Sequence, residues 1–336
     1  MGASYQILTH KDLEQLGGMD QEFASDVLVG LSMTPKRLSS RYFYDERGSR
    51  LFQKIMELPE YYLTACEFDI LRSKKEKISA FIEEESFNLV ELGAGDGRKT
   101  SIILEHFLEK KLIFKYIPVD ISEAAMMALM NLLNTKFPQL ISKGIVAEYF
   151  NGLKWLNHMS SHKNMVLFLG SNLGNFDKAH ARAFLHNLWN VLNNDDLVMI
   201  GFDLKKDINL MLKAYNDKEG ITAEFNLNLL RRINQKLGGN FDLKKFLFHS
   251  SYDVFTGAME SYLVSKEKQT VVIKEISQSF SFEAWEPIHT EYSYKYLESD
   301  IQELATETGF VIEKQLYDSK GYFVDSIWRV QKLSSS

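Results

Sequence analysis

The chain has 336 residues, of which 45% are hydrophobic and 25% charged, a composition typical of a globular protein with a substantial core. Its formal net charge of −6 argues against a nucleic-acid partner, because a phosphate backbone requires a basic face. A single cysteine, Cys66, excludes an intrachain disulfide and fits a reducing compartment. We see no apolar signal segment and no bilayer-length apolar run, so we expect a cytoplasmic monomer with no membrane partner.

The first two thirds of the chain are predicted to change from helices to an alternating pattern. Residues 1–65 are expected to be helical with loops and to end in the turn-rich segment SSRYFYDERGSRLF. From 88 to 204 apolar strands alternate with helix-length segments, and Ser122 is placed to cap one of those helices. The predicted strands are 88–93, 116–121, 145–150, 164–170 and 196–203. Strands that are apolar throughout and alternate with helices indicate a parallel sheet covered on both faces.

After Asp203 the alternation stops. Residues 205–240 are predicted to be helical, and 248–294 alternate with a period of two, as β-strands do. A helix over 296–308 and two further strands close the chain. The Met-rich segment AAMMALMNLL, further back at 124–133, is expected to pack in the core.

These patterns predict an α/β protein of two domains. A doubly wound, mostly parallel sheet is expected over 66–204, completed by 296–333. A second, α+β domain is expected to consist of 1–65 and the insertion 205–295.

A glycine-rich loop follows the first strand of the alternating region, in the sequence VELGAGDG. Gly93 and Gly95 would let the backbone turn sharply and approach a ligand closely. In a doubly wound sheet a ligand binds beyond the carboxyl ends of the strands. Asp120 ends the next strand and is placed to accept hydrogen bonds from ribose hydroxyls. The loop therefore predicts a site for an adenosine-bearing cofactor.

The cofactor could be a nicotinamide dinucleotide or S-adenosylmethionine, since both carry adenosine. The spacing is G-x-G-x-G rather than the G-x-G-x-x-G of dinucleotide folds. Glu91 and Asp96 would repel a pyrophosphate but suit the cationic methionine portion of S-adenosylmethionine. A methyltransferase is therefore favoured over an oxidoreductase, and a glycine-rich turn without a ligand is the remaining alternative.

Several segments in order along the chain decide between these readings. RYFYDERGSRLFQKIMELPEYYLTACEFDILR, VELGAGDGRKT, YIPVDIS, VLFLGSNLGNF, KAYNDKEGITAEFNLNLL and HTEYSYKY together resemble the histidine-specific Nα-methyltransferase family of ergothioneine biosynthesis. The resemblance covers about residues 30 to 330. It implies a Rossmann-like class I methyltransferase domain with a second, substrate-binding domain. It also implies transfer of methyl groups from S-adenosylmethionine to the α-amine of histidine, up to the trimethylated betaine, with S-adenosylhomocysteine as product.

The resemblance also implies roles for residues near the cofactor. The family's cofactor loop matches Gly93, Gly95 and Lys99, and its ribose-binding acid matches Asp120. Where the family has an Asp-Phe pair beside adenine, this chain has Tyr149-Phe150. Phe150 retains the aromatic ring that would pack on the base, whereas Tyr149 replaces the acid that would accept from the adenine amine.

On the substrate side, the resemblance implies that Asn175 and Tyr215 hold the amino acid's carboxylate. The amine end would be bordered by Tyr44 and by the backbone of Gly170. Tyr44 is the expected catalytic residue, since it would orient the neutral amine for in-line attack and pass a proton to solvent. No strong base is required for this role.

The remaining substrate positions would surround the side chain of the amino acid. Phe52 and Tyr61 match further pocket positions, and Glu291 and Ser293 match the residues that bind imidazole. One position departs from the family, because Ser261 stands where the family has a methionine against the imidazole. A serine there widens the pocket and adds a hydroxyl. The pocket could still take histidine, or it could take a larger or more polar amine.

Three further possibilities are considered. His158 and His162 are four residues apart, as in a metal pair on a helix, but without a third ligand we expect no metal. An RNA-modifying methyltransferase is disfavoured by the acidic charge. A protein that binds the cofactor without catalysis is the third possibility, which the changes at Tyr149 and Ser261 leave open.

Overall fold

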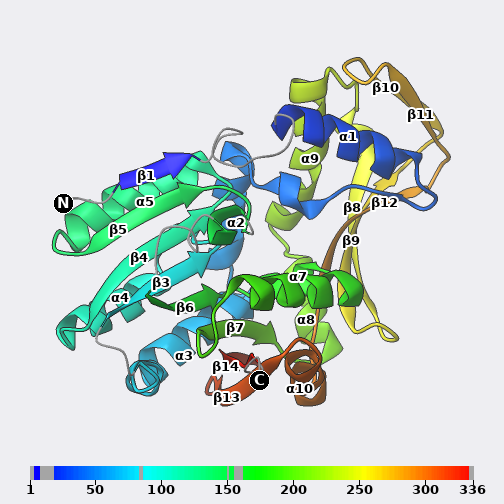
Figure 1. Ribbon diagram of the computed structural model, residues 1–336. Coiled ribbons are helices and arrows are strands. Elements are labelled where there is room, and N and C mark those ends of the chain that lie inside the picture. The colour runs from blue at the N-terminus through cyan, green and yellow to red at the C-terminus, as the bar shows by residue number, and fades with distance from the viewer. Residues whose placement is uncertain (1–3, 8–18, 83–85, 150, 155–161, 333–336) are drawn as a thin grey trace. The chain divides into compact units, whose positions relative to one another are not determined.

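The computed structural model describes residues 4–7, 19–82, 86–149, 151–154 and 162–332 (Figure 1). They form two compact units. The first contains the N-terminal strand, Leu63–Lys205 and the chain from Lys295 onward, and the second contains the N-terminal helix up to Tyr62 together with Lys206–Tyr294. The inner boundaries lie within three residues of those expected from the sequence (63 against 66, 205 against 204, 295 against 296).

The first unit is built on an eight-stranded sheet in the order β1-β5-β4-β3-β6-β7-β14-β13 (Figure 1). Its first six strands are parallel, whereas β14 runs antiparallel to both β7 and β13. This mostly parallel sheet confirms the α/β fold expected from the alternating pattern. The strands are β1 (Ser4–Ile7), β3 (Ser86–Leu92), β4 (Ile113–Asp120), β5 (Ile141–Val146), β6 (Lys163–Phe168), β7 (Leu197–Asp203), β13 (Phe310–Tyr317) and β14 (Phe323–Val330).

Helices connect the strands of this sheet, and the expected capping and burial are present. Ser122 accepts a hydrogen bond from Ala125 N at the start of α5, which confirms the predicted cap. Met126 and Met130 of α5 are buried, as expected of a core helix. The helices are α3 (Tyr62–Ser79), α4 (Thr100–Glu109), α5 (Glu123–Lys136), η2 (Asn172–Asn175), α7 (Lys178–Val191) and α10 (Glu298–Glu307).

The strand order reverses direction between β3 and β6. From β3 the chain winds outward through β4 and β5, and from β6 it winds the other way through β7. Such a switch leaves a crevice beyond the carboxyl ends of the two central strands, where ligands of doubly wound sheets bind. The glycine-rich loop after β3 and the turn at Gly170 after β6 both lie at this switch point.

Two expectations for this unit were wrong. The strand predicted over 145–150 ends at Val146, because the chain bends at Ala147 and is helical again at 151–154. The N-terminal segment was assigned to the second domain, but β1 pairs in parallel with β5 and extends the first unit's sheet. The four residues SYQI have too short a pattern to reveal which sheet edge they join.

The second unit combines a four-stranded sheet, in the order β2-β12-β9-β8, with a hairpin of β10 and β11. Its strands are β2 (Lys36–Arg37), β8 (Phe246–Asp253), β9 (Ala258–Ser265), β10 (Gln269–Ile273), β11 (Gln278–Phe282) and β12 (Pro287–Tyr294). Its helices are α1 (Met19–Ser32), η1 (Ser40–Phe43), α2 (Glu46–Glu57), α8 (Ile208–Tyr215), α9 (Ile221–Leu237) and η3 (Leu243–Lys245).

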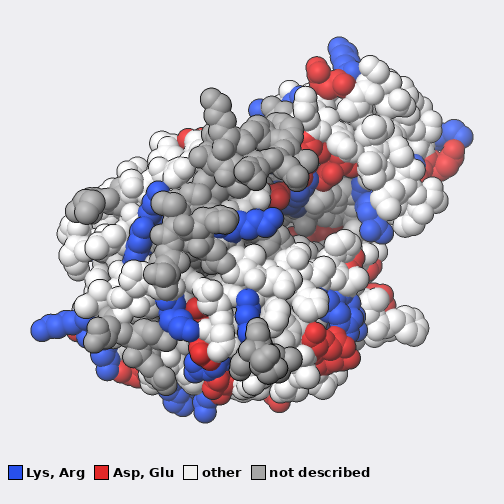
Figure 2. Space-filling model, in the orientation of Figure 1, with Lys and Arg blue, Asp and Glu red and all other residues white. Residues whose placement is uncertain are grey.

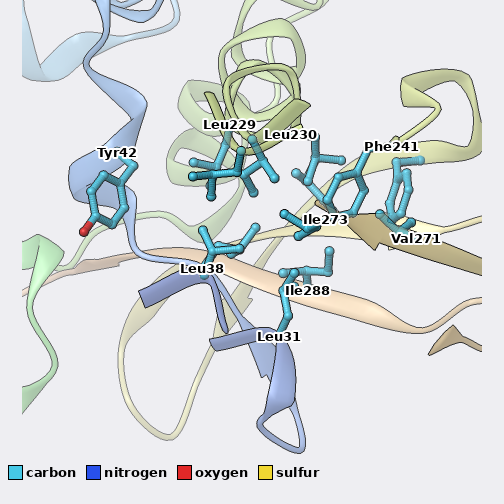
Figure 3. Packing of buried hydrophobic residues seen from close by; sticks show 14 of the residues in the cluster. Leu31, Leu38, Tyr42, Leu229, Leu230, Phe241, Val271, Ile273 and Ile288 are labelled. Carbon is cyan, nitrogen blue, oxygen red and sulfur yellow. The ribbon is translucent and has the colours of Figure 1, made fainter. Parts of the chain in front are cut away.

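Helix α9 supplies much of the second unit's core. Figure 3 shows Leu229 and Leu230 facing Leu38, Ile273 and Ile288, and all five side chains are buried. Burying side chains of this size stabilises the fold by about 1.5–3 kcal/mol each. One face of the sheet is therefore fixed against α9.

A β-bulge in β12 changes which face its later residues occupy. His289 pairs with Tyr262, but the next pair is Glu291 with Ser261, so one extra residue lies between them. Thr290 faces α9 and donates to Asn226 Oδ1 at 2.8 Å, so strict alternation would direct the next residue, Glu291, away from α9. The bulge instead puts Glu291 and Ser293 on the same face as Ile288.

Four further features concern membrane-spanning helices, surface charge, the cysteine and possible metal ligands in the described part of the chain. No helix in the described ranges is long and apolar enough to cross a membrane. On the face shown in Figure 2, basic and acidic side chains are interspersed and form no continuous basic stripe. Cys66 is buried and forms no disulfide within the described residues. Among the described side chains there is no group of three or more potential metal ligands, and His158 lies outside the described residues.

Candidate functional site: a glycine loop and a line of aromatic rings

The glycine-rich loop is held across the end of β4. Gly93 N donates to Val119 O at 2.8 Å, and Gly95 N donates to Asp120 Oδ2 at 2.9 Å. Gly95 has φ +55°, and a Cβ added there would meet nothing within 4 Å, so the loop has open space beside it. Gly93 has no such room, because an added Cβ would lie 3.1 Å from Tyr149 Oη and from Asn172 Nδ2. The positive φ of Gly95 and the open space beside it fit the close approach of a cofactor to the backbone.

Asp120 joins two loops at the carboxyl ends of the strands. Its Oδ2 accepts from Gly95 N, and its Oδ1 accepts from Ser122 N at 2.8 Å. Burial raises the pKa of Asp120, while these backbone donors act in the opposite direction. Each carboxylate oxygen can accept a second hydrogen bond. The acid is thus placed to serve ribose hydroxyls, and that contact stays a prediction.

Glu91 lies behind the loop and already has two partners. Thr100 Oγ1 donates to one of its oxygens and Tyr116 Oη to the other. The side chain is buried, and burial raises the pKa of Glu91 to about 7 against the lowering by the two hydrogen bonds. These partners give Glu91 a part in holding β3 to α4 and β4. Its direct contact with the cofactor stays a prediction.

Lys99, at the start of α4, is fixed by an acid that the sequence analysis did not single out. Its Nζ donates to Glu67 of α3, and the other oxygen of Glu67 accepts from Gly170 N at 2.7 Å. Glu67 is almost completely buried, and burial of such a charge requires a partner of opposite charge. Glu67 thus links two expected site residues at the switch point. In the sequence it appears only as one polar residue of an amphipathic helix.

Tyr149 lies against the same loop. Its ring packs edge-on against Phe168 at 5.4 Å and Phe184 at 6.1 Å between centroids. Burial raises the pKa of Tyr149, so it stays a neutral hydroxyl. Phe150 lies outside the described residues, and Asn175 closes η2 just after the Gly170 turn. Adenine and substrate contacts by these residues stay predictions.

In the second unit, four expected substrate residues form one line of aromatic rings. The ring centroids are 5.6 Å apart for Tyr44 and Phe52, 6.3 Å for Phe52 and Tyr61, and 6.1 Å for Tyr61 and Tyr215. Phe225 of α9 packs beneath, 5.7 Å from Tyr44 and 5.8 Å from Phe52. Sequence reasoning missed Phe225 because its helical pattern marks it only as a core residue.

Polar side chains from the adjoining sheet lie on the face toward α9. Glu291 pairs with Ser261, and Ser261 with Ser250, so the three side chains form one row across three strands. We call this row the polar rung. Tyr215 Oη lies 2.7 Å from Ser293 Oγ, which ties the aromatic line to the next pair of residues. The Oγ of Ser250 is buried and has no hydrogen-bond partner within the described residues.

The expected residues therefore fall into two groups, one in each unit. The switch point of the first unit brings together the glycine loop, Lys99, Asp120, Tyr149 and Gly170. Gly170 and Asn175, which were expected to contact the substrate, therefore lie in the first unit. The second unit brings together the aromatic line, the polar rung and Ser293. The first group has the backbone amides and acid that suit a ribose-bearing cofactor. The second offers rings and a carboxylate that suit a small organic cation or an N–H donor.

Comparison with known proteins identifies the family. The model of the histidine-specific, S-adenosylmethionine-dependent methyltransferases matches residues 23–330. Histidine N-alpha-methyltransferase from Mycolicibacterium smegmatis is 32% identical over 284 residues, covering 84% of this chain and 87% of that protein. Ergothioneine biosynthesis protein 1 from Schizosaccharomyces pombe is 30% identical, covering 89% of this chain and 39% of that protein.

A more distant relative has a different substrate in its name. The 4-dimethylallyltryptophan N-methyltransferase of Claviceps fusiformis is 24% identical over 311 residues, covering 87% of each chain. The family model spans nearly the whole chain, including both units and the segments that carry the glycine loop, the aromatic line and the polar rung. The chain belongs to the histidine-specific, S-adenosylmethionine-dependent methyltransferase family.

Proposed function

We propose that this enzyme methylates the α-amine of free L-histidine, successively up to the trimethylated betaine, and that it does so in the cytoplasm. S-adenosylmethionine supplies a methyl group on a cationic sulfur. In each turnover the C–S bond breaks as the N–C bond forms, and S-adenosylhomocysteine and one proton are released. The protein must bind the amino acid, direct its lone pair and allow the proton to leave.

The observation that carries this proposal is the polar rung beside the aromatic line. Glu291 is only partly buried and has Ser261 opposite it, on the face of the sheet that packs on α9. A carboxylate on this face can accept a hydrogen bond from the N–H of an imidazole. The hydroxyl pair of Tyr215 and Ser293 adds a second polar contact on the same face.

The aromatic line suits the amine end of the substrate. At neutral pH most free α-amine is protonated, so a proton must be lost before each attack. Tyr44 is the residue to which we assign orientation of the amine, an effect of position rather than of basicity. Phe52 and Tyr61 present ring faces that attract a methylated cation. The product's permanent charge is thereby tolerated.

The alternative is a larger or more polar amine in the same pocket. Ser261 and Ser250 are small and carry hydroxyls, so a larger or more polar substrate has room and hydrogen-bonding groups beside Glu291. The relative named for 4-dimethylallyltryptophan shows by its name that related chains act on other amino acids. Histidine is favoured because Glu291 and Ser293 together match a ring that donates an N–H.

Mass spectrometry of a competition assay tests the proposal. Purified protein and S-adenosylmethionine are incubated with an equimolar pool of free amino acids and aromatic amines. We expect histidine to gain up to three methyl groups. Methylation of another amine in place of histidine would transfer the activity to the alternative, and cofactor binding without any methylation would contradict catalysis itself.

A pair of matched variants tests the assignment of Glu291. Glu260 is on the adjacent strand but on the opposite face of the sheet, where it accepts from Tyr262. We expect Glu291→Gln to raise the KM for histidine by about tenfold to a hundredfold, the effect of losing a charged hydrogen bond. Glu260→Gln should leave that KM within about twofold of the wild-type value, because Glu260 lies on the other face of the sheet and is not assigned a contact with the substrate. Equal effects of the two changes would contradict the assignment.

A further inference from the structure

Two buried acids meet behind the cofactor-binding face of the first unit, and only one cation lies with them among the described groups. Glu67 of α3 and Asp325 of β14 are both almost fully buried. The cation is Lys99, which donates to Glu67. Glu91 of β3 is a third buried acid whose charge acts on Lys99. Three acids with one lysine cannot all be ionised at low cost in a dry interior.

The fold makes room for this cluster at one glycine. Asp325 stands opposite Gly201 in the pairing of β14 with β7. A Cβ added at Gly201 would lie 2.6 Å from Glu67 Oε1, so any side chain there would displace the Glu67 carboxylate. The absence of a side chain at Gly201 lets Glu67 reach the sheet and contact both Gly170 N and Lys99.

Glu67 has hydrogen-bond donors on both of its oxygens, whereas Asp325 has none among the described residues. Glu67 already accepts from Gly170 N and from Lys99. Neither carboxylate oxygen of Asp325 has a donor within the described part of the chain, although Asp325 is within hydrogen-bonding reach of Glu67. Two carboxylates can share such a contact only if one of them carries a proton. A neutral Asp325 supplies that proton.

We propose that Asp325 is a protonated carboxylic acid whose O–H donates to Glu67. This hydrogen bond holds Glu67 in place, and Glu67 is in turn a positioning residue that fixes Lys99 and the Gly170 turn for the cofactor. The proposal rests on the cofactor contact assigned to Lys99. Glu67 takes one of the three N–H groups of the Lys99 ammonium, which leaves two for a ligand carboxylate. Both residues act through Lys99 and Gly170, since neither is assigned a contact with a reacting atom.

The electrostatics agree with this arrangement. Burial, and then the charge of Glu67, raises the pKa of Asp325 well above its ordinary value, against the lowering by Lys99. Burial lowers the pKa of Lys99, but the charge and hydrogen bond of Glu67 raise it above its ordinary value. These directions fit a charged Lys99 beside a neutral Asp325.

Equilibrium binding of S-adenosylhomocysteine tests the proposal without requiring histidine or turnover. We expect Asp325→Leu to weaken binding by about tenfold to a hundredfold, the scale of a lost charged hydrogen bond. Asp325→Asn should recover most of this loss, because its amide N–H replaces the donor. Failure of Asn to recover affinity, while Leu and Asn variants both stay folded, would overturn the proposal.

The pH profile separates a shared proton from simple packing. As the pH rises and Asp325 ionises, the affinity of the wild type should fall more steeply than that of Asp325→Asn, which cannot ionise there. Identical profiles for the two proteins would overturn the proposal. The infrared difference spectrum of wild type against Asp325→Asn at pH 8 should also contain a carboxylic-acid carbonyl band that shifts on ¹³C-aspartate labelling. Absence of that band would overturn it as well.

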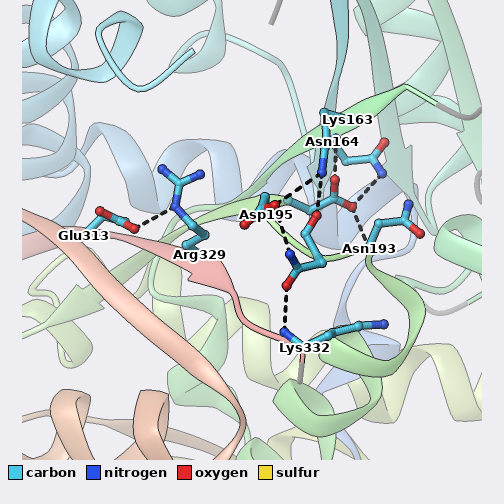
Figure 4. A network of polar contacts seen from close by, with 9 residues as sticks. Lys163, Asn164, Asn193, Asp195, Glu313, Arg329 and Lys332 are labelled. Carbon is cyan, nitrogen blue, oxygen red and sulfur yellow. Dashed lines mark hydrogen bonds and ion pairs between the residues drawn. The ribbon is translucent and has the colours of Figure 1, made fainter. Parts of the chain in front are cut away.

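A second perturbation and a matched control complete the experiment. Gly201→Ala should weaken cofactor binding, because its Cβ would displace Glu67 without altering any charge. The control is Asp196→Asn, another buried aspartate, which accepts from Asn164 N at 3.0 Å and from Asn193 N at 2.9 Å. Its partners Asn164 and Asn193 are labelled in the polar network of Figure 4. Asp196→Asn should leave affinity within about twofold.

These measurements separate the present proposal from the proposed function. If the wild type binds S-adenosylhomocysteine but methylates an amine other than histidine, the substrate assignment fails and the role of Asp325 is still measured. If histidine is methylated and Asp325→Leu binds the cofactor as the wild type does, only the present proposal fails.

Discussion

The two units place their functional groups in different ways. In the first unit the expected cofactor residues are backbone amides and charged side chains held from behind by buried partners, as Asp120 holds Gly95 and Glu67 holds Lys99. In the second unit the expected substrate residues are aromatic rings from helices and loops, together with serines and Glu291 on one face of a sheet. A change in the first group disturbs neighbouring charges, whereas a change at Ser261 alters the space and the hydroxyl groups beside Glu291 without altering a charge. The difference suggests why a common cofactor site can serve different amines.

The largest effect is expected at Asp120. Asp120→Ala removes the acceptor of Gly95 N and Ser122 N and the carboxylate assigned to ribose, so several hydrogen bonds are lost together. We expect the affinity for S-adenosylhomocysteine to fall at least about a hundredfold by calorimetry. The control is Asp177→Ala, which removes the cap of α7 by leaving His180 N unpaired. It should lower stability by about 1 kcal/mol with little loss of affinity.

Unchanged affinity in Asp120→Ala would refute the ribose assignment and remove the main distinction between the two units. The glycine loop and Asp120 could both be predicted from sequence, because each follows an apolar strand and the carboxyl ends of parallel strands share one edge. Glu67 and Asp325 could not be predicted, since they meet only in the folded chain and are 258 residues apart in sequence (325 − 67). The fold was predictable where strands and helices are long, and β1 was missed where the pattern is short.

A smaller effect, on stability, is expected from Glu91. Its pKa in the folded protein is about 7, above its ordinary value of 4.5, so the folded state holds the proton more tightly than the unfolded state. The stabilisation is complete below about pH 4.5 and is lost as the pH rises through about 7. From pH 5 to 8 this amounts to roughly 2 kcal/mol of unfolding free energy.

Chemical denaturation of the wild type and of Glu91→Gln at pH 5 and pH 8 measures this contribution. The difference between the two pH values should be smaller in Glu91→Gln by about the amount given above, because glutamine does not titrate. An equal pH dependence in both proteins would show that Glu91 is ionised throughout the range. The first unit would then tolerate more buried charge than we infer.

The second unit is tested by removing one hydroxyl. Tyr215→Phe keeps the ring of the aromatic line but breaks the contact with Ser293. We expect the KM for histidine to rise by about tenfold, the scale of one buried hydrogen bond, with cofactor affinity unchanged. Tyr262→Phe is the matched control, because its hydroxyl bonds to Glu260 on the other face of the sheet. Loss of cofactor affinity in Tyr215→Phe would contradict the division of roles.

Glu291 shows why this second group was harder to derive from sequence. Alternation from the buried Ile288 places Glu291 on the far face, where an acid would be solvated. The bulge between His289 and Glu291 reverses that placement, and no glycine or proline in HTEYS marks it. Only the resemblance to the family pointed to this acid, and the register explains how it comes to face α9.

The smallest effect is expected at Ser250. Its hydroxyl is buried without a partner in the described structure, so no hydrogen bond offsets its desolvation, and Ser250→Ala should leave the unfolding free energy unchanged or raise it by up to about 1 kcal/mol. Histidine is assigned hydrogen bonds to Glu291 and Ser293 and none to Ser250, so Ser250→Ala should change the KM for histidine by less than about threefold. An amine that reaches past Ser261 would instead lose a hydrogen bond, and its kcat/KM would fall by about tenfold. Measuring both substrates with this one variant therefore decides whether the polar rung binds histidine alone, because only a side chain longer than that of histidine extends as far as Ser250.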